Sequence, residues 1–114
     1  MTRPLQATDF TIPSDSRLKE NVQTVDSALD KVLKMRGVYF NKSDDPTRRI
    51  GVIAQEVEQV LPEVVHTDDS PEQMKAVSYA NIVGLLIEAI KEQQEMIDEL
   101  KKQILEIKHA TNQI

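Results

Sequence analysis

The spacing of apolar residues predicts one long helix in the C-terminal third of the chain. From Ser78 onward there is no proline, and apolar residues recur on one helical face. Ser78 is a residue type that favours the N-cap position, so we expect the helix to begin there. Counting in sevens places the following residues in the seam at positions a and d: Val83, Leu86, Ile90, Gln93, Ile97, Leu100, Ile104, Ile107, Thr111 and Ile114. This repeat predicts a coiled coil.

The residue types in the seam favour three strands over two. Isoleucine at a with leucine at d favours a dimer, whereas isoleucine at both positions shifts the preference to higher oligomers. Here position a is almost all isoleucine, and position d is mixed and includes Gln93 and Ile107. We expect a solvated outer face, with an ion pair between Asp98 and Lys102, because the charged residues fall outside the seam. These residues are Glu92, Glu95, Asp98, Glu99, Lys102 and Glu106.

Shorter elements precede the long helix. Helical spacing of apolar residues predicts one helix over 25–36, ended by Gly37, and another over 52–61, ended by Pro62. Between them, residues 37–42 (GVYFNK) favour a strand, and the polar stretch after it reads as a loop. The pattern therefore predicts one strand and a loop between two helices.

Two β-prone runs come next. Residues 63–67 (EVVHT) and 75–79 (KAVSY) flank DDSPEQM, whose residues favour a loop, so an antiparallel hairpin is expected. The fold class is thus α+β and mainly helical. It consists of a small head of short helices and a few antiparallel strands, followed by a long helix that forms a trimeric coiled coil.

Composition supports association. The 114 residues include four aromatics (Phe10, Tyr39, Phe40 and Tyr79) and no tryptophan or cysteine, so the apolar content is mostly aliphatic. A chain this short has no room for two full cores. Without cysteine there are no disulfides, thiolate metal sites or cysteine nucleophiles. The net charge of −5 argues against nucleic acid as a partner, and no stretch approaches the roughly 20 apolar residues of a membrane span.

Metal and cofactor sites are not predicted. His66 and His109 lie far apart in sequence, and the three glycines are isolated, so neither a metal-ligand spacing nor a phosphate loop is present. His66 with Asp68 and Asp69 could in principle hold a cation, but an exposed polar loop is the favoured interpretation. The carboxylates of residues 51–74 are expected to form a solvated acidic surface.

Residues 13–22 (PSDSRLKENV) are the remaining candidate for chemistry. On composition alone, Ser14 or Asp15 capping a helical turn is the simpler interpretation. The alternative is a Ser/Lys dyad, in which a neutral Lys19 amine takes the proton of the Ser14 hydroxyl. Desolvation or a cationic neighbour such as Arg17 would favour the neutral amine. Residues five apart do not meet on a regular helix or strand, so an irregular turn or a second chain is required.

Three blocks, in order, resemble a known family: SDSRLKENV (14–22), RRIGVIAQEVEQVLPEVV (48–65) and AVSYANIVGLLIEAIKEQ (76–93). They are similar to the C-terminal intramolecular chaperone and auto-processing domain of phage tail spikes and tail fibres, as in endosialidase. A related domain occurs in myelin regulatory factor, but the acidic charge leaves DNA binding as the weakest of the interpretations. The resemblance favours the Ser/Lys dyad over the simple cap.

The resemblance implies a homotrimer that helps an upstream tail spike or fibre segment to trimerise and fold, and then cuts itself off. Ser14 would be the nucleophile and Lys19 the general base, with Asp15, Arg17 and Asn21 in supporting positions. Cleavage is expected at the Pro13–Ser14 bond, with Ser14–Asp15 as the alternative. No cofactor is implied.

The implied division of the chain is a stub of the upstream client (1–13), a chaperone and auto-processing head (14–78) and a coiled-coil helix (79–114). The domain would act in the host cytoplasm during virion assembly and be released from the mature fibre. The competing function is a non-catalytic trimeric coiled-coil assembly module, in which Ser14 only caps a turn.

Overall fold

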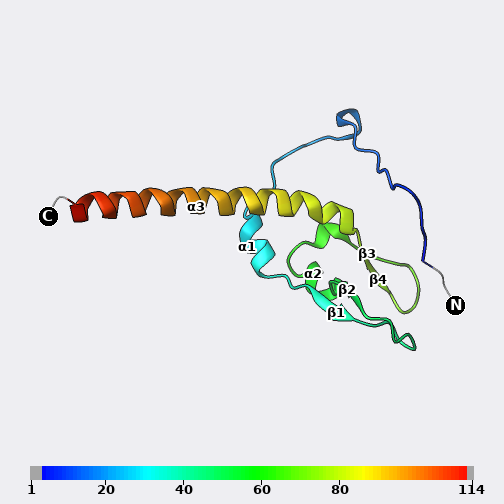
Figure 1. Ribbon diagram of the computed structural model, residues 1–114. Coiled ribbons are helices and arrows are strands. Elements are labelled where there is room, and N and C mark those ends of the chain that lie inside the picture. Colours follow the sequence, from blue (N-terminus) through cyan, green and yellow to red (C-terminus); the bar gives the residue numbers. More distant parts are fainter. Residues whose placement is uncertain (1–3, 113–114) are drawn as a thin grey trace.

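The protein is a small head attached to the start of one long helix (Figure 1). An extended N-terminal segment loops out from the head and returns to it, so that Pro4 lies beside residues 42–47. The structure, a computed structural model, describes residues 4–112. Its radius of gyration is 20.5 Å and its extents are 72 × 42 × 32 Å. A compact domain of this length has a radius of gyration of about 13 Å. The chain is therefore elongated.

Helix α3 (Ile82–Asn112) is the predicted long helix. It follows the short 3-10 turn η3 (Tyr79–Asn81) and projects well beyond the head (Figure 1). Ser78 takes the N-cap position of η3, which leads into α3, but its side chain makes no cap bond, and its hydroxyl lies 2.8 Å from His66 Nε2 instead. The expected Asp98–Lys102 pair is not formed in the described chain either, since Asp98 accepts a hydrogen bond from Gln94.

Helix α1 (Ala28–Leu33) packs across α3 near its head end (Figure 1). It is shorter at both ends than the predicted 25–36. Ser27 has a left-handed backbone (φ 49°), which stops the helix from extending toward residue 25. At the other end, the Lys34 N–H donates to the carbonyls of Lys31 and Val32, which makes a tighter turn than an α-helix. Gly37 does not adopt the left-handed conformation of a glycine cap.

The segment between the two predicted helices is a hairpin rather than one strand and a loop. Strand β1 (Val38–Phe40) pairs antiparallel with β2 (Arg49–Gly51), with Tyr39 opposite Ile50. The prediction missed β2 because only Ile50 in it is strongly β-prone. A side chain at Gly51 would force a shift, since a Cβ there would lie 2.6 Å from Tyr79 Oη. That hydroxyl accepts a hydrogen bond from Val52 N at 3.1 Å.

The second predicted helix and the predicted hairpin are both present. Helix α2 (Ala54–Glu58) ends earlier than expected, and Pro62 begins the 3-10 turn η2 (Pro62–Val64) rather than ending α2 directly. Strands β3 (Val65–Thr67) and β4 (Lys75–Val77) form the antiparallel pair, with His66 opposite Ala76. The α+β, mainly helical class is thus confirmed.

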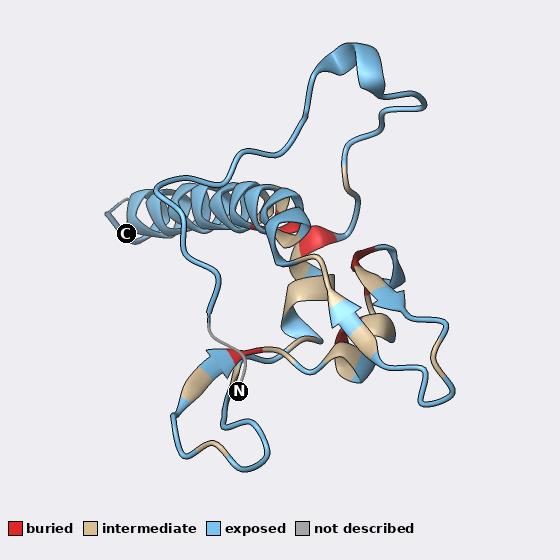
Figure 2. Ribbon diagram, turned by 90° about the vertical axis from the view of Figure 1, so that its right-hand side faces the viewer, coloured by how far each residue is buried: buried red, intermediate tan, exposed pale blue. Residues whose placement is uncertain are grey.

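A small hydrophobic core joins the head to α3. Figure 2 shows buried residues confined to the head and the first turns of α3, while the rest of α3 is exposed. The core residues are Ala28, Val57, Leu61, Val64, Leu85 and Ala89. Leu85 is only 2% exposed, whereas Ile90 of the predicted seam is 66% exposed. One stripe of α3 therefore contacts the head, and a separate apolar stripe is not covered by any of residues 4–112.

Candidate functional site

The side chains of Ser14 and Lys19 meet in the structure. Lys19 Nζ donates a hydrogen bond to Ser14 Oγ at 2.7 Å, within a single chain. This separation lies in the range at which a general base can take a proton from a nucleophile. The contact thus forms without a second chain, which the sequence alone left open.

An irregular turn makes this contact possible. Residues Ser16–Leu18 form the 3-10 turn η1, closed by hydrogen bonds from Leu18 N to Asp15 O (3.0 Å) and from Lys19 N to Ser16 O (3.1 Å). A 3-10 turn is tighter than an α-helical turn, and Lys19 leaves it in an extended conformation. The chain consequently folds back so that Lys19 reaches Ser14.

Asp15 caps this turn and holds Arg17. Its Oδ1 accepts hydrogen bonds from Arg17 N (2.9 Å) and Nε (3.0 Å), and its Oδ2 accepts one from Arg17 Nη2 (2.9 Å). These hydrogen bonds lower the pKa of the Asp15 carboxyl. The bonds from the Arg17 side chain have the larger effect and the bond from the Arg17 backbone the smaller. The same carboxylate raises the pKa of Arg17. The Arg17 charge is therefore balanced by Asp15 instead of facing Lys19 alone.

Asn21 lies just beyond the turn with a left-handed backbone (φ 53°). Asparagine tolerates this conformation better than most residues other than glycine. It bends the chain after Lys19, and its contribution to the site is thus to the path of the backbone.

The whole site lies on the surface. Every residue from 14 to 22 is exposed, including the apolar Leu18 (69%) and Val22 (78%). Proton transfer between a serine and a lysine is favoured when the amine is desolvated, since burial disfavours its charged form. Among residues 4–112 no side chain covers Lys19, and the apolar side chains of Leu18 and Val22 beside the Ser14–Lys19 contact are open to solvent.

The predicted seam also lies on the surface of the single chain. Val83, Leu86, Ile90, Ile97, Leu100, Ile104 and Ile107 are all exposed large hydrophobic residues. Gln93 is exposed as well. Ile114, the last predicted seam residue, lies outside the described residues.

His66 and Asp68 of the β3–β4 hairpin make contacts of their own. Residues 4–112 contain no group of three histidine or carboxylate side chains arranged to hold a metal ion. His66, one of the candidates considered, contacts Ser78, and Asp68 accepts hydrogen bonds from Ser70 and Met74. Across the same residues no helix is long and apolar enough to cross a membrane.

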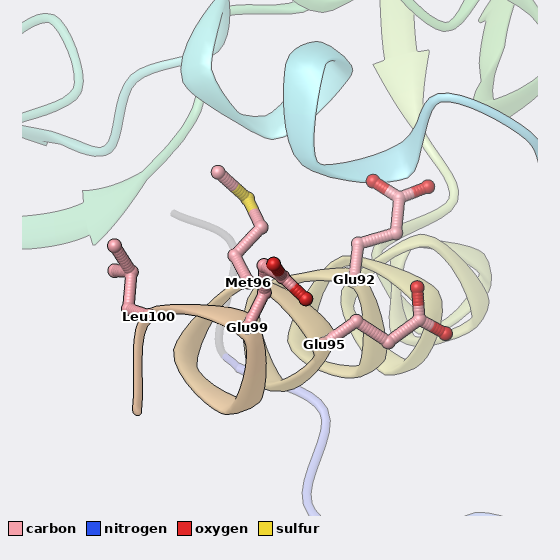
Figure 3. Close-up of a pocket in the computed structure, with 5 residues that line it drawn as sticks. All are labelled: Glu92, Glu95, Met96, Glu99 and Leu100. Atoms are coloured by element: carbon pink, nitrogen blue, oxygen red, sulfur yellow. The ribbon is translucent and has the colours of Figure 1, made fainter. Parts of the chain in front are cut away.

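Glu92 has a role that the heptad pattern did not reveal. It was expected to face water, but its carboxylate accepts hydrogen bonds from Ala28 N (3.0 Å) and Leu29 N (2.8 Å) at the start of α1. Figure 3 shows Glu92 reaching toward α1, beside Met96, in a hollow also lined by Glu95, Glu99 and Leu100. Only the docking of α1, a tertiary contact, could reveal this bond.

Comparisons with known proteins place this site at the start of a family domain. A model of a peptidase family described as the chaperone of endosialidase matches residues 14–66, so the match begins at Ser14 and ends within β3. It includes the turn that carries Lys19 and most of the head.

Curated relatives are long tail fiber proteins named Gp37. That of Enterobacteria phage K3 is 34% identical over 108 residues, which cover 89% of this chain and 9% of the relative. Those of Salmonella phage S16 and Enterobacteria phage M1 are 34% and 35% identical, covering 88% and 82% of this chain and 15% and 40% of the relatives. The chain thus corresponds to a minor part of each relative. Its residues 14–66 match the chaperone of endosialidase family.

Proposed function

We propose that this chain is a homotrimeric intramolecular chaperone of a phage tail fibre or tail spike, and that it releases itself by autoproteolysis at Ser14. The family match and the tail fibre relatives support the chaperone role. The 2.7 Å contact between Lys19 Nζ and Ser14 Oγ carries the autoproteolytic part. The division into stub (1–13), head (14–78) and coiled coil (79–114) follows from the same proposal.

The chemistry starts with a neutral Lys19 amine. It takes the proton of the Ser14 hydroxyl as Oγ attacks the carbonyl carbon of Pro13. The C–N bond between Pro13 and Ser14 breaks, the Ser14 nitrogen receives the proton from Lys19, and Pro13 is left as an ester on Ser14 Oγ. Water then hydrolyses that ester, which yields a Pro13 carboxylate and restores the hydroxyl. Attack at the Ser14–Asp15 bond is the less favoured alternative.

Assembly would control this reaction. Lys19 is exposed in a single chain, and burial under a neighbouring chain would favour the neutral amine that the reaction needs. Leu18 and Val22, both exposed beside the dyad, are suited to such an interface. Cleavage would then follow correct trimer formation and serve as a check on it.

The coupling of chaperone and protease has a physical purpose. Intertwined three-chain stalks form slowly, because distant segments must be brought together before native contacts reward them. A seam built from local helical structure lets three chains associate early. Cleavage afterwards leaves the fibre kinetically trapped, since the released stalk has lost its easy refolding route. This would take place in the host cytoplasm during virion assembly.

A second candidate function is a trimeric assembly module without catalysis. The observation that favours it is the Asp15 cap, which accounts for turn η1 without any chemical role for Ser14. In that case Lys19 and Ser14 form only a surface hydrogen bond.

Mass spectrometry of the purified full chain distinguishes the two. Autoproteolysis predicts a product that begins at Ser14 in the wild type, and its absence in both Ser14→Ala and Lys19→Ala. Lys31→Ala, which removes an amine outside the site, is the matched control and should be cleaved normally. An intact wild-type trimer, or cleavage that survives Ser14→Ala, would overturn the autoproteolytic proposal and leave the assembly module.

A further inference from the structure

Between Val83 and Ile107 the predicted seam of α3 is aliphatic except for Gln93. Gln93 lies three residues after Ile90 and four before Ile97, on the same stripe of the helix as both. The adjacent Gln94 donates to Asp98 at 2.9 Å, but in the described chain the amide of Gln93 makes no side-chain hydrogen bond. Its donors and acceptor are therefore available to another copy of α3.

We propose that Gln93 fixes the register and the number of strands when three copies of α3 associate. This inference rests on the proposed homotrimer. In the aligned trimer the three Gln93 amides meet at the axis and hydrogen-bond with one another. If one chain slips by a heptad, its Gln93 lies against Leu86 or Leu100 of the others, and a buried amide is left unpaired. Polar residues in a seam specify coiled-coil register in this way at some cost in stability.

Register has consequences for the head because the two are connected beside Gln93. Glu92, the preceding residue, accepts the hydrogen bonds from Ala28 N and Leu29 N that attach α1 to α3. A slip of one heptad would displace one head along the axis by about 10.5 Å. The exposed Ser14–Lys19 segment, which enters the head just before α1, would be displaced with it. Gln93 thus aligns the three heads at the level where they join α3.

The aliphatic layers alone would not prevent such a slip. Ile90, Ile97 and Ile104 are alike at successive a positions, so a one-heptad shift exchanges isoleucine for isoleucine. The d layers differ at Gln93, which is flanked by Leu86 and Leu100. In the middle of the seam, a one-heptad shift therefore places a polar side chain, Gln93, against leucine.

Crosslinking of the full chain tests this. The sequence has no cysteine, so introduced cysteines report without background. In one experiment, Gln103→Cys chains are mixed with Lys108→Cys chains, whose thiols face each other at g and e positions in the aligned register. In the other, Gln103→Cys chains are mixed with Lys101→Cys chains, whose thiols face each other only after a one-heptad slip. Ser14→Ala is included throughout, so that cleavage does not alter the chains.

In the wild-type seam we expect only the aligned crosslink. Gln93→Leu should remain associated, melt at least about 5 °C higher and give both crosslinks, or a mixture of oligomers in sedimentation. Gln94→Leu, the matched change outside the a and d positions, should keep the aligned crosslink alone. A trimeric wild type in which Gln93→Leu keeps only the aligned crosslink overturns this inference and spares the trimer. A monomeric wild type overturns both.

Discussion

Glu92 of α3 accepts a hydrogen bond from the backbone nitrogen of Ala28, the first residue of α1, at 3.0 Å. Its second carboxylate oxygen accepts one from Leu29 N at 2.8 Å. Helix α1 has no cap bond from its own Ser27, whose backbone is left-handed. A carboxylate from another helix therefore satisfies the free N–H groups at this helix start and complements their partial positive charge. This contact ties the head to α3.

Removing that carboxylate should weaken the head. Glu92→Ala is expected to lower the free energy of unfolding by about 0.5–2 kcal/mol, the usual range for loss of a helix cap. Urea denaturation at neutral pH measures it. Glu95→Ala is the control, because Glu95 is the same residue type, lies about one helical turn further along α3 and makes no hydrogen bond to α1 in the described chain. Equal losses in the two variants would show that the cap contributes nothing specific.

Elements with strong local patterns could be predicted from the sequence, and elements made by pairing could not. Helix α3 has a clear heptad periodicity. The β3–β4 hairpin has two β-prone runs separated by loop-forming residues. Strand β2 is formed by Arg49, Ile50 and Gly51, of which only Ile50 favours a strand. It exists because β1 offers a partner and because Tyr79 closes over Gly51. Neither contact is local.

The candidate site, too, could be predicted only in part. The block from Ser14 to Lys19 was identified by its resemblance to a family, but ideal helix or strand geometry would have kept the two side chains apart. The 3-10 turn between them, capped by Asp15, brings them within 2.7 Å. The role of Glu92 escaped prediction because its heptad position is typical of a solvated residue, and α1 covers it only in the folded head.

The contact between Tyr79 and the β2 end should be visible in a double-mutant cycle. Tyr79→Phe removes the acceptor of Val52 N and is expected to cost about 1 kcal/mol of unfolding free energy. Gly51→Ala should cost more, since its Cβ would lie 2.6 Å from Tyr79 Oη and 3.1 Å from Phe40 Cε1. In the Tyr79→Phe background part of that clash is gone, so the double variant should lose less than the sum. Strict additivity would contradict the arrangement.

Protonation of Asp15 should open turn η1. Arg17 holds the pKa of the Asp15 carboxyl below its ordinary value of 3.8. A carboxyl whose folded pKa is lowered stabilises the folded turn above its ordinary value, and that stabilisation disappears as the pH falls through the lowered value. NMR titration of the side-chain carboxyl carbon measures the midpoint. In Arg17→Ala the midpoint should rise toward 3.8; an unchanged midpoint would mean that Arg17 is not the cause.

Two leucines of α3 should respond differently to the same truncation. Leu85 is 2% exposed in the core of the head, so Leu85→Ala is expected to cost about 2–5 kcal/mol of head stability. Leu100 is 57% exposed in the single chain and lies in the proposed seam, so its loss should matter chiefly between chains. If the proposed trimer forms, we therefore expect Leu85→Ala to keep the association of the wild type with a weakened head, and Leu100→Ala to dissociate at higher protein concentration than the wild type. Sedimentation equilibrium together with urea denaturation separates the two effects. If Leu100→Ala left the association unchanged, the exposed stripe of α3 would not be the surface that three chains bury.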